Sequence, residues 1–101
     1  MEFPQKMYTK WFDCDKINCE LTVRTRRSGD YMAVSQSGGH KKLTRCMIND
    51  KIPGELRGKL PLVVDGNEVL WIVGGRINER YKITSETGRV LEITYQGGNV
   101  Q

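Results

Sequence analysis

The chain has 101 residues, 38% of them hydrophobic, and a formal net charge of +4. This length fits one compact domain with a modest core, and no stretch approaches the roughly 20 apolar residues of a membrane span. The N-terminus is polar and lacks the features of a signal peptide, so we expect a cytoplasmic protein.

The first half of the chain predicts two strands followed by a helix. Residues 7–12 are rich in aromatic side chains and are typical of an opening strand. Residues 20–26 alternate with period two and predict a second strand, which a turn at 28–30 ends. Apolar side chains at helical spacing then predict a helix from about Lys41 to Asn49.

A second short helix is predicted immediately downstream. Pro53 suits the first position of a helix, and Leu56 and Leu60 lie one turn apart on its expected buried side. We expect Pro61 to end it.

The remainder predicts β structure. The Asp65-Gly66 pair is a strong hairpin signal within residues 62–73. Residues 81–83 and 90–95 predict further strands, while 96–101 is expected to be a frayed tail. The alternation in the last strand points three side chains inward: Leu91, Ile93 and Tyr95. The expected fold is α+β, with mainly antiparallel strands and two short helices.

The cysteines and the histidine do not form a recognisable site. Cys14, Cys19 and Cys46 lack the spacing of a zinc site, and His40 is the single histidine. We expect reduced, structural thiols, no metal and no cofactor in this domain. The chain also lacks the sequence signatures of a nucleophile or a paired-carboxylate site, so we do not expect it to be catalytic alone.

Positive charge is concentrated in the middle of the chain. Residues 21–60 carry nine Lys or Arg against three Asp or Glu, a net +6, whereas residues 1–20 and 61–101 each sum to −1. A polyphosphate partner favours such a concentration because each neutralised phosphate releases counterions. A solvated face that keeps the protein soluble is the alternative.

Two basic segments are candidates for phosphate contact. Ser37-Gly38-Gly39-His40-Lys41-Lys42 is expected at the helix start, where free amides attract anions, and Arg45 follows on the helix. The alternative is an ordinary glycine-rich loop with solvated lysines. Arg24 and Arg26 are expected to project from one strand face, with Arg27 beside them. The distance between the two side chains would be about that between successive phosphates along a nucleic-acid backbone. Charges that protect an edge strand are the alternative there.

Aromatic side chains offer a further RNA-binding hypothesis. Tyr8, Trp11, Tyr31 and Trp71 could stack on unpaired bases. They lie within apolar runs, however, and core packing is favoured.

Two longer patterns connect the chain to a known family. The run Leu-x-x-Arg-x-Arg-x-x-Gly-Asp is matched by Leu21, Arg24, Arg26, Gly29 and Asp30. The run Trp-x-x-Gly-x-Arg-Ile-x-Glu-x-Tyr-Lys is matched by Trp71, Gly74, Arg76, Ile77, Glu79, Tyr81 and Lys82. Over residues 7–95 the chain resembles the C-terminal domain of bacterial tRNA(Ile)-lysidine synthetase. Ser28 stands where many members have proline, so we expect a looser turn.

The resemblance implies a fold, a partner and a role. The fold would be the α+β domain shared with the phenylalanyl-tRNA synthetase β subunit, with Trp71, Ile77 and Tyr81 in the core and Arg76 as a candidate contact. The domain would grip the acceptor-stem side of isoleucine tRNA. The catalytic domain, which precedes it in the family, would use ATP to ligate lysine to C2 of the wobble cytidine. Because Met1 leads directly into this domain, we expect a piece cut from a longer protein.

A second function remains open beside tRNA binding. The basic region would then be a protein-interaction surface that docks on the catalytic domain or on a second subunit, including a homodimer.

Overall fold

The computed structural model describes residues 6–18, 20–35 and 39–97. These residues form an α+β fold with mostly antiparallel strands, as the sequence predicts. In chain order the elements are β1 (Lys6–Asp13), η1 (Cys14–Lys16), β2 (Leu21–Arg24), β3 (Tyr31–Ala33), β4 (His40–Lys42), α1 (Leu43–Asn49), α2 (Gly54–Arg57), β5 (Leu62–Asp65), β6 (Glu68–Ile72), η2 (Glu79–Tyr81) and β7 (Val90–Gly97), where η is a 3₁₀ turn.

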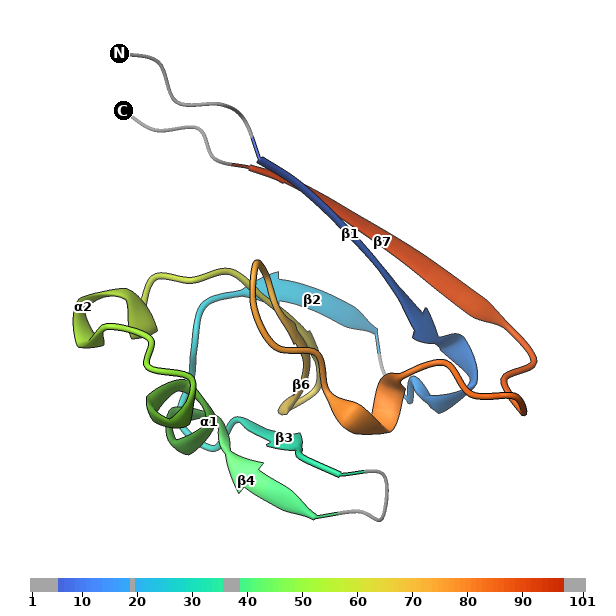
Figure 1. The fold of residues 1–101 in the computed structure, drawn as a ribbon, viewed down its shortest axis with the longest axis horizontal. Helices are drawn as coiled ribbons and strands as arrows, with labels where there is room; N and C mark the ends of the chain where they lie inside the picture. Colours follow the sequence, from blue (N-terminus) through green and yellow to red (C-terminus); the bar gives the residue numbers. More distant parts are fainter. Residues whose placement is uncertain (1–5, 19, 36–38, 98–101) are drawn as a thin grey trace.

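Two sheets form the domain. Five strands pair in the order β2-β5-β6-β3-β4, and β1 pairs with β7 as a separate antiparallel ribbon. Among the described residues, the larger sheet has one parallel contact, between β3 and β6, where Tyr31 faces Glu68. Figure 1 shows the ribbon on one side of the body and the helices on the other. The larger sheet therefore separates two layers.

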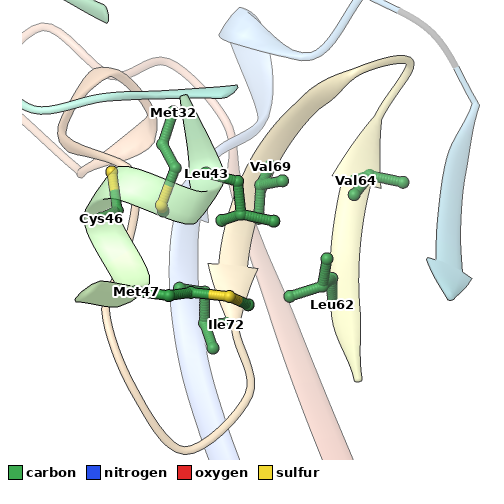
Figure 2. Packing of buried hydrophobic residues seen from close by; sticks show 8 residues of the cluster. All are labelled: Met32, Leu43, Cys46, Met47, Leu62, Val64, Val69 and Ile72. Atoms are coloured by element: carbon green, nitrogen blue, oxygen red, sulfur yellow. The ribbon is translucent and has the colours of Figure 1, made fainter. Parts of the chain in front are cut away.

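Each face of the larger sheet buries its own hydrophobic cluster. Leu62 and Val64 of β5 pack with α1, whereas Val63 between them packs on the ribbon side. Figure 2 shows the α1-side cluster, which joins Met32, Leu43, Cys46, Met47, Leu62, Val64, Val69 and Ile72. Burial on both faces explains why β5 and β6 are continuous apolar runs rather than alternating ones.

A bulge in β6 places two consecutive large side chains in the ribbon-side cluster. Val63 pairs with Trp71 and Val64 pairs with Val69, so Leu70 is the extra residue. Leu70 and Trp71 are both fully buried there, together with Tyr81. The core assignment of Trp71, Ile77 and Tyr81 is thereby confirmed.

The strongest local signals are confirmed. The hairpin turns at Gly66, whose φ of 69° is one that glycine adopts without a steric penalty. In β7 the side chains Leu91, Ile93 and Tyr95 are half-buried and alternate with exposed ones. The strand continues through Gln96 and Gly97, into the segment expected to be frayed, because both residues pair with the start of β1.

Several boundaries differ from the prediction. The helix expected from Lys41 begins at Leu43, because His40–Lys42 pairs with β3 as an edge strand. Residues 81–83 do not form a strand; Tyr81 ends the turn η2. The second helix ends at Arg57 rather than at Pro61, and Leu56 is 41% exposed rather than buried.

The expectation that the aromatic side chains pack in the core is wrong for two of them. Tyr31 is half-buried, belongs to neither hydrophobic cluster and has its ring against that of His40. Trp11 is 50% exposed on the ribbon, whereas its neighbour Phe12 is fully buried. Successive side chains of a strand point to opposite faces, so only one of this pair can face the core.

Helix α1 ends with a lysine in the left-handed backbone conformation. The amide of Ile52 donates to the Met47 carbonyl at 3.0 Å, and that of Lys51 donates to Ile48 at 2.9 Å. These two bonds define a Schellman motif, whose left-handed position normally holds glycine. Here Lys51 occupies it, with φ of 62°.

Candidate nucleic-acid interface

A basic hollow lies where the loop after β2 meets the junction of β4 and α1. Its volume is about 650 Å³, and three of its lining residues are predicted contacts: Arg26, Arg27 and Lys42. Ser28 and Thr44 add hydroxyl groups to the lining, beside Tyr31. The fold thus gathers cations that are up to 16 positions apart in the sequence (Arg26 to Lys42) around one cavity.

Asp30 forms the structural centre of this hollow. It is 4% exposed, and its carboxylate accepts hydrogen bonds from Arg24 Nη1 at 2.9 Å and Nη2 at 2.8 Å. The backbone N–H of Arg27 donates to the same carboxylate at 2.8 Å. The backbone carbonyl of Asp30 accepts the N–H of Leu43, the first residue of α1, at 2.9 Å. One residue therefore ties the loop to the helix start.

The electrostatics of this pair favour its ionised form. Burial alone would raise the pKa of Asp30, but the hydrogen bonds from the Arg24 guanidinium and the Arg27 amide hold that pKa below its ordinary value. The same bond to Asp30 raises the pKa of Arg24. A bidentate pair between two such groups is stronger and more directional than a neutral hydrogen bond.

Arg24 itself faces inward rather than toward solvent. Its side chain is 11% exposed and also donates to the Gly66 carbonyl at 3.3 Å in the β5–β6 turn. The expected spacing of Arg24 and Arg26 on one strand face is wrong, because β2 ends at Arg24. Arg26 lies in the following loop and is exposed.

The two lysines of β4 point in different directions. Neighbouring strand residues alternate faces, and Lys42 lines the hollow whereas Lys41 is not among its lining residues. The expected placement of both lysines in the first turn of a helix is wrong, because Lys41 lies in the strand and Lys42 is the N-cap of α1. Ser37 and Gly38, which also belonged to that prediction, lie outside the described residues. Arg45 is exposed on α1 and likewise does not line the hollow.

Arg76 lies apart from the hollow in an ion pair. Its Nε donates to Asp50 Oδ2 at 2.9 Å, and its Nη2 contacts the other carboxylate oxygen. The bond raises the pKa of Arg76 and lowers that of Asp50. The pair joins the end of α1 to the turn after β6.

A buried polar network stiffens the hairpin next to Arg24. The hydroxyl of Tyr81 donates to Asp65 Oδ2 at 2.9 Å, and Arg80 contacts Glu68 through two nitrogens at 3.2 Å. Burial is the main reason that the pKa of the Tyr81 hydroxyl is raised well above its ordinary value. Both carboxylates flank the turn at Gly66, so the network holds in place the turn whose Gly66 carbonyl accepts a hydrogen bond from Arg24.

Sequence reasoning missed the roles of Asp30 and Thr44 at this site. The signal for Asp30 was present: an acid six residues after Arg24, next to a glycine, inside the first family pattern. Tyr31 was considered only as an aromatic side chain that could stack on bases, and its pairing with Lys42 brings it to the hollow. Thr44 carries no such signal; it lies in the first turn of α1.

A second, more apolar groove lies between α2, β1 and the turn after β6. Its volume is about 400 Å³, and its lining includes Tyr8, Ile52, Leu56, Leu60 and Val73. Within the described part of the chain, neither a cluster of metal-ligating side chains nor a helix able to cross a membrane is present. Cys14 and Cys46 are free cysteines, and Cys19 lies outside the described residues.

Comparisons with known proteins agree on one family. A family model described as "TilS substrate C-terminal domain" matches residues 21–93. The chain is 42% identical over 94 residues to a tRNA(Ile)-lysidine synthase of Caldanaerobacter subterraneus subsp. tengcongensis, covering 93% of this chain and 20% of that protein. A tRNA(Ile)-lysidine synthase of Clostridium tetani is 42% identical over 91 residues, covering 90% of this chain and 20% of its own length.

A solved structure agrees with the sequence comparison. A crystal structure titled as a TILS C-terminal domain superposes with a TM-score of 0.67 at 25% identity, covering 98% of this chain and 86% of that one. The chain spans about a fifth of the length of the curated relatives it matches.

Proposed function

Since the chain belongs to the TilS substrate C-terminal domain family, we propose that it is the substrate-recognition domain of a tRNA(Ile)-lysidine synthase. It binds the phosphate backbone on the acceptor-stem side of isoleucine tRNA. The remainder of the enzyme ligates lysine to C2 of the wobble cytidine with ATP, in the cytoplasm. The domain holds no cofactor and is not catalytic alone.

The observation that supports tRNA binding best is the basic hollow. Arg26, Arg27 and Lys42 supply three cations to one cavity, and Ser28 and Thr44 supply hydroxyl donors. Phosphate oxygens accept from arginine, lysine, serine and threonine alike. An A-form duplex is recognised mainly through its backbone, because its major groove is too narrow for side chains to reach the base edges.

The neighbouring cations have supporting roles. Lys41 is exposed on β4, next to Lys42, and Arg45 is exposed on α1. Both add to the positive field that steers the tRNA toward the hollow. Asp50 holds two of the three guanidinium nitrogens of Arg76, so we assign this residue the weakest contribution. Energy gained from these contacts orients the distant anticodon loop in the catalytic domain, which is catalysis by placement.

The test is a titration of this chain with isoleucine tRNA and with an unrelated duplex RNA at two salt concentrations. We expect binding that favours the tRNA and weakens steeply with salt, since each phosphate contact contributes about −0.7 to −0.9 to the slope of log K against log salt. Absence of binding to either RNA contradicts an independent recognition role.

The apolar groove supports a second candidate function. In its lining the 41% exposed Leu56 lies with Ile52 and Leu60, and a contiguous apolar surface marks protein contacts. In this alternative the domain docks on the catalytic domain or on a second subunit. Binding to the separately purified catalytic domain, insensitive to salt and abolished by Leu56→Asp, would favour it over RNA recognition.

A further inference from the structure

We propose that Arg24 and Asp30 are positioning residues: their buried ion pair braces the loop that presents Arg26 and Arg27 to phosphate. The inference rests on the proposed function and deepens it. Of the three arginines in this short segment, Arg24 holds the loop, and Arg26 and Arg27 reach the ligand.

The loop between the two paired residues has little else to fix it. Arg26, Arg27, Ser28 and Gly29 are all exposed. The N–H of Asp30 donates to the Arg27 carbonyl at 3.3 Å, which closes a four-residue turn. Gly29 adopts φ of 91°, the value required at the third position of a type II turn. A single weak backbone bond and a glycine do not by themselves hold two arginines in place.

The ion pair supplies the missing constraint. Arg24 reaches across the loop to Asp30, and the Asp30 carboxylate in turn accepts the Arg27 N–H. We call the Arg24–Asp30 ion pair the brace. Both of its residues are also bonded to other elements: the Arg24 side chain donates to the Gly66 carbonyl, and the Asp30 carbonyl accepts from the Leu43 N–H. The hairpin turn, the loop and the start of α1 are thereby linked on one side of the hollow.

Neutralising Asp30 has two opposite expected effects on RNA affinity, one from the lost charge and one from the lost ion pair with Arg24. Asp30→Asn removes a negative charge beside a phosphate site, so electrostatics alone predicts tighter RNA binding. Loss of the brace predicts weaker binding, because the loop must be ordered again each time RNA binds. Arg24→Lys keeps the charge but lacks the planar fork that holds both carboxylate oxygens.

The experiment measures RNA affinity and its salt slope for wild type, Arg24→Lys and Asp30→Asn, each shown to be folded by circular dichroism. Glu55→Gln, an exposed acid on α2, is the matched control for the charge change of Asp30→Asn. For each phosphate that the loop no longer binds, we expect both brace variants to bind about five- to eightfold more weakly at 0.1 M salt, with a correspondingly smaller slope. A merely structural defect lowers the folded fraction and leaves the slope of the folded protein unchanged.

A rescue variant sharpens the test. Ser28 occupies the second position of the turn, where proline is favoured because its φ is already fixed near −65°. Ser28→Pro should restore part of the affinity of Arg24→Lys by restricting the same loop in another way. Unchanged affinity in Arg24→Lys together with tighter binding by Asp30→Asn overturns the proposal; if Asp30→Asn does not fold, Arg24→Lys decides alone.

Failure of the brace and failure of the proposed function give different results. A wild-type chain that binds no RNA overturns the proposed function. Amide exchange at Arg27 then judges the brace in the free protein: it is slow in wild type and faster in Arg24→Lys if the pair orders the loop, and equal in both if it does not.

Discussion

Lys41 and Lys42 form a matched pair that tests whether the hollow, rather than net charge, binds RNA. The two residues are neighbours on β4, both are exposed, and substitution of either by alanine lowers the net charge by one. Lys42 lines the hollow and Lys41 does not. Any difference in RNA affinity between the two variants therefore depends on which face of β4 the lysine occupies, because the change in net charge is the same.

The expected size of the effect follows from counterion release. If Lys42 contacts one phosphate, Lys42→Ala lowers the salt slope by about 0.7 to 0.9, which is a five- to eightfold loss of affinity at 0.1 M salt. Lys41→Ala removes only a charge that solvent and salt screen over about 10 Å, so we expect less than about a twofold loss. Both variants should retain wild-type stability within about 0.5 kcal/mol, because both side chains are exposed.

The assay is a fluorescence-anisotropy titration of labelled isoleucine tRNA between 50 and 200 mM salt, about the range over which phosphate contacts dominate affinity. Thermal melts of both variants are the control for folding. Equal losses in the two variants would refute the reasoning and leave a diffuse electrostatic attraction. A larger loss in Lys41→Ala would place the RNA on the opposite face of β4.

Three further predictions concern the stability of the fold that carries the hollow. Lys51→Gly should stabilise the protein by about 0.5–1 kcal/mol, because it removes a left-handed penalty of about 1–2 kcal/mol at the end of α1 and adds a smaller entropic cost; a melting temperature that does not rise by about 2–8 °C contradicts this. Tyr81→Phe removes the 2.9 Å donor to Asp65 and should destabilise by about 1–3 kcal/mol in urea unfolding, whereas an unchanged midpoint would show that the bond is dispensable. The folded pKa of Asp30 lies below its unfolded value, so its contribution to stability is present above about pH 4 and is lost as the pH falls through the folded pKa. The unfolding free energy measured from pH 6 to pH 2 should therefore decline less steeply in Asp30→Asn than in wild type. The same decline in both proteins would show that the Asp30–Arg24 pair does not contribute to acid-dependent stability.

Sequence patterns were sufficient where a single local rule dominates. The Asp65-Gly66 pair located the hairpin because few residues other than glycine accept the positive φ there. The inward positions of β7 followed from period-two alternation, since this ribbon strand has one face on the core. Local chemistry is enough in such cases because distant residues do not compete with it.

The same rules were insufficient where pairing with distant residues decides the structure. β3 and β4 have three residues each, too few to show a period, and β4 consists of His40, Lys41 and Lys42. Its apolar neighbours Leu43, Cys46 and Met47 carry a helical period, so the prediction extended the helix backward over the strand. Only the pairing with β3 reveals the boundary.

The basic residues illustrate why a charge count alone does not locate a binding site. Two of the three acids among residues 21–60 are engaged by arginines: Asp30 by Arg24 and Asp50 by Arg76. Among the described residues, the side chains of Arg26, Arg27 and Lys42 make no ion pair.

The net charge of the middle third is therefore not spread evenly over its surface. The arginines held by acids fix the loop and the end of α1, whereas Arg26, Arg27 and Lys42 line one hollow. An arginine that pairs with a buried acid contributes little to the outer field, yet it determines where its neighbours point. The affinity of this surface for a polyanion should accordingly depend as much on Asp30, a negative residue, as on any one of the cations it positions.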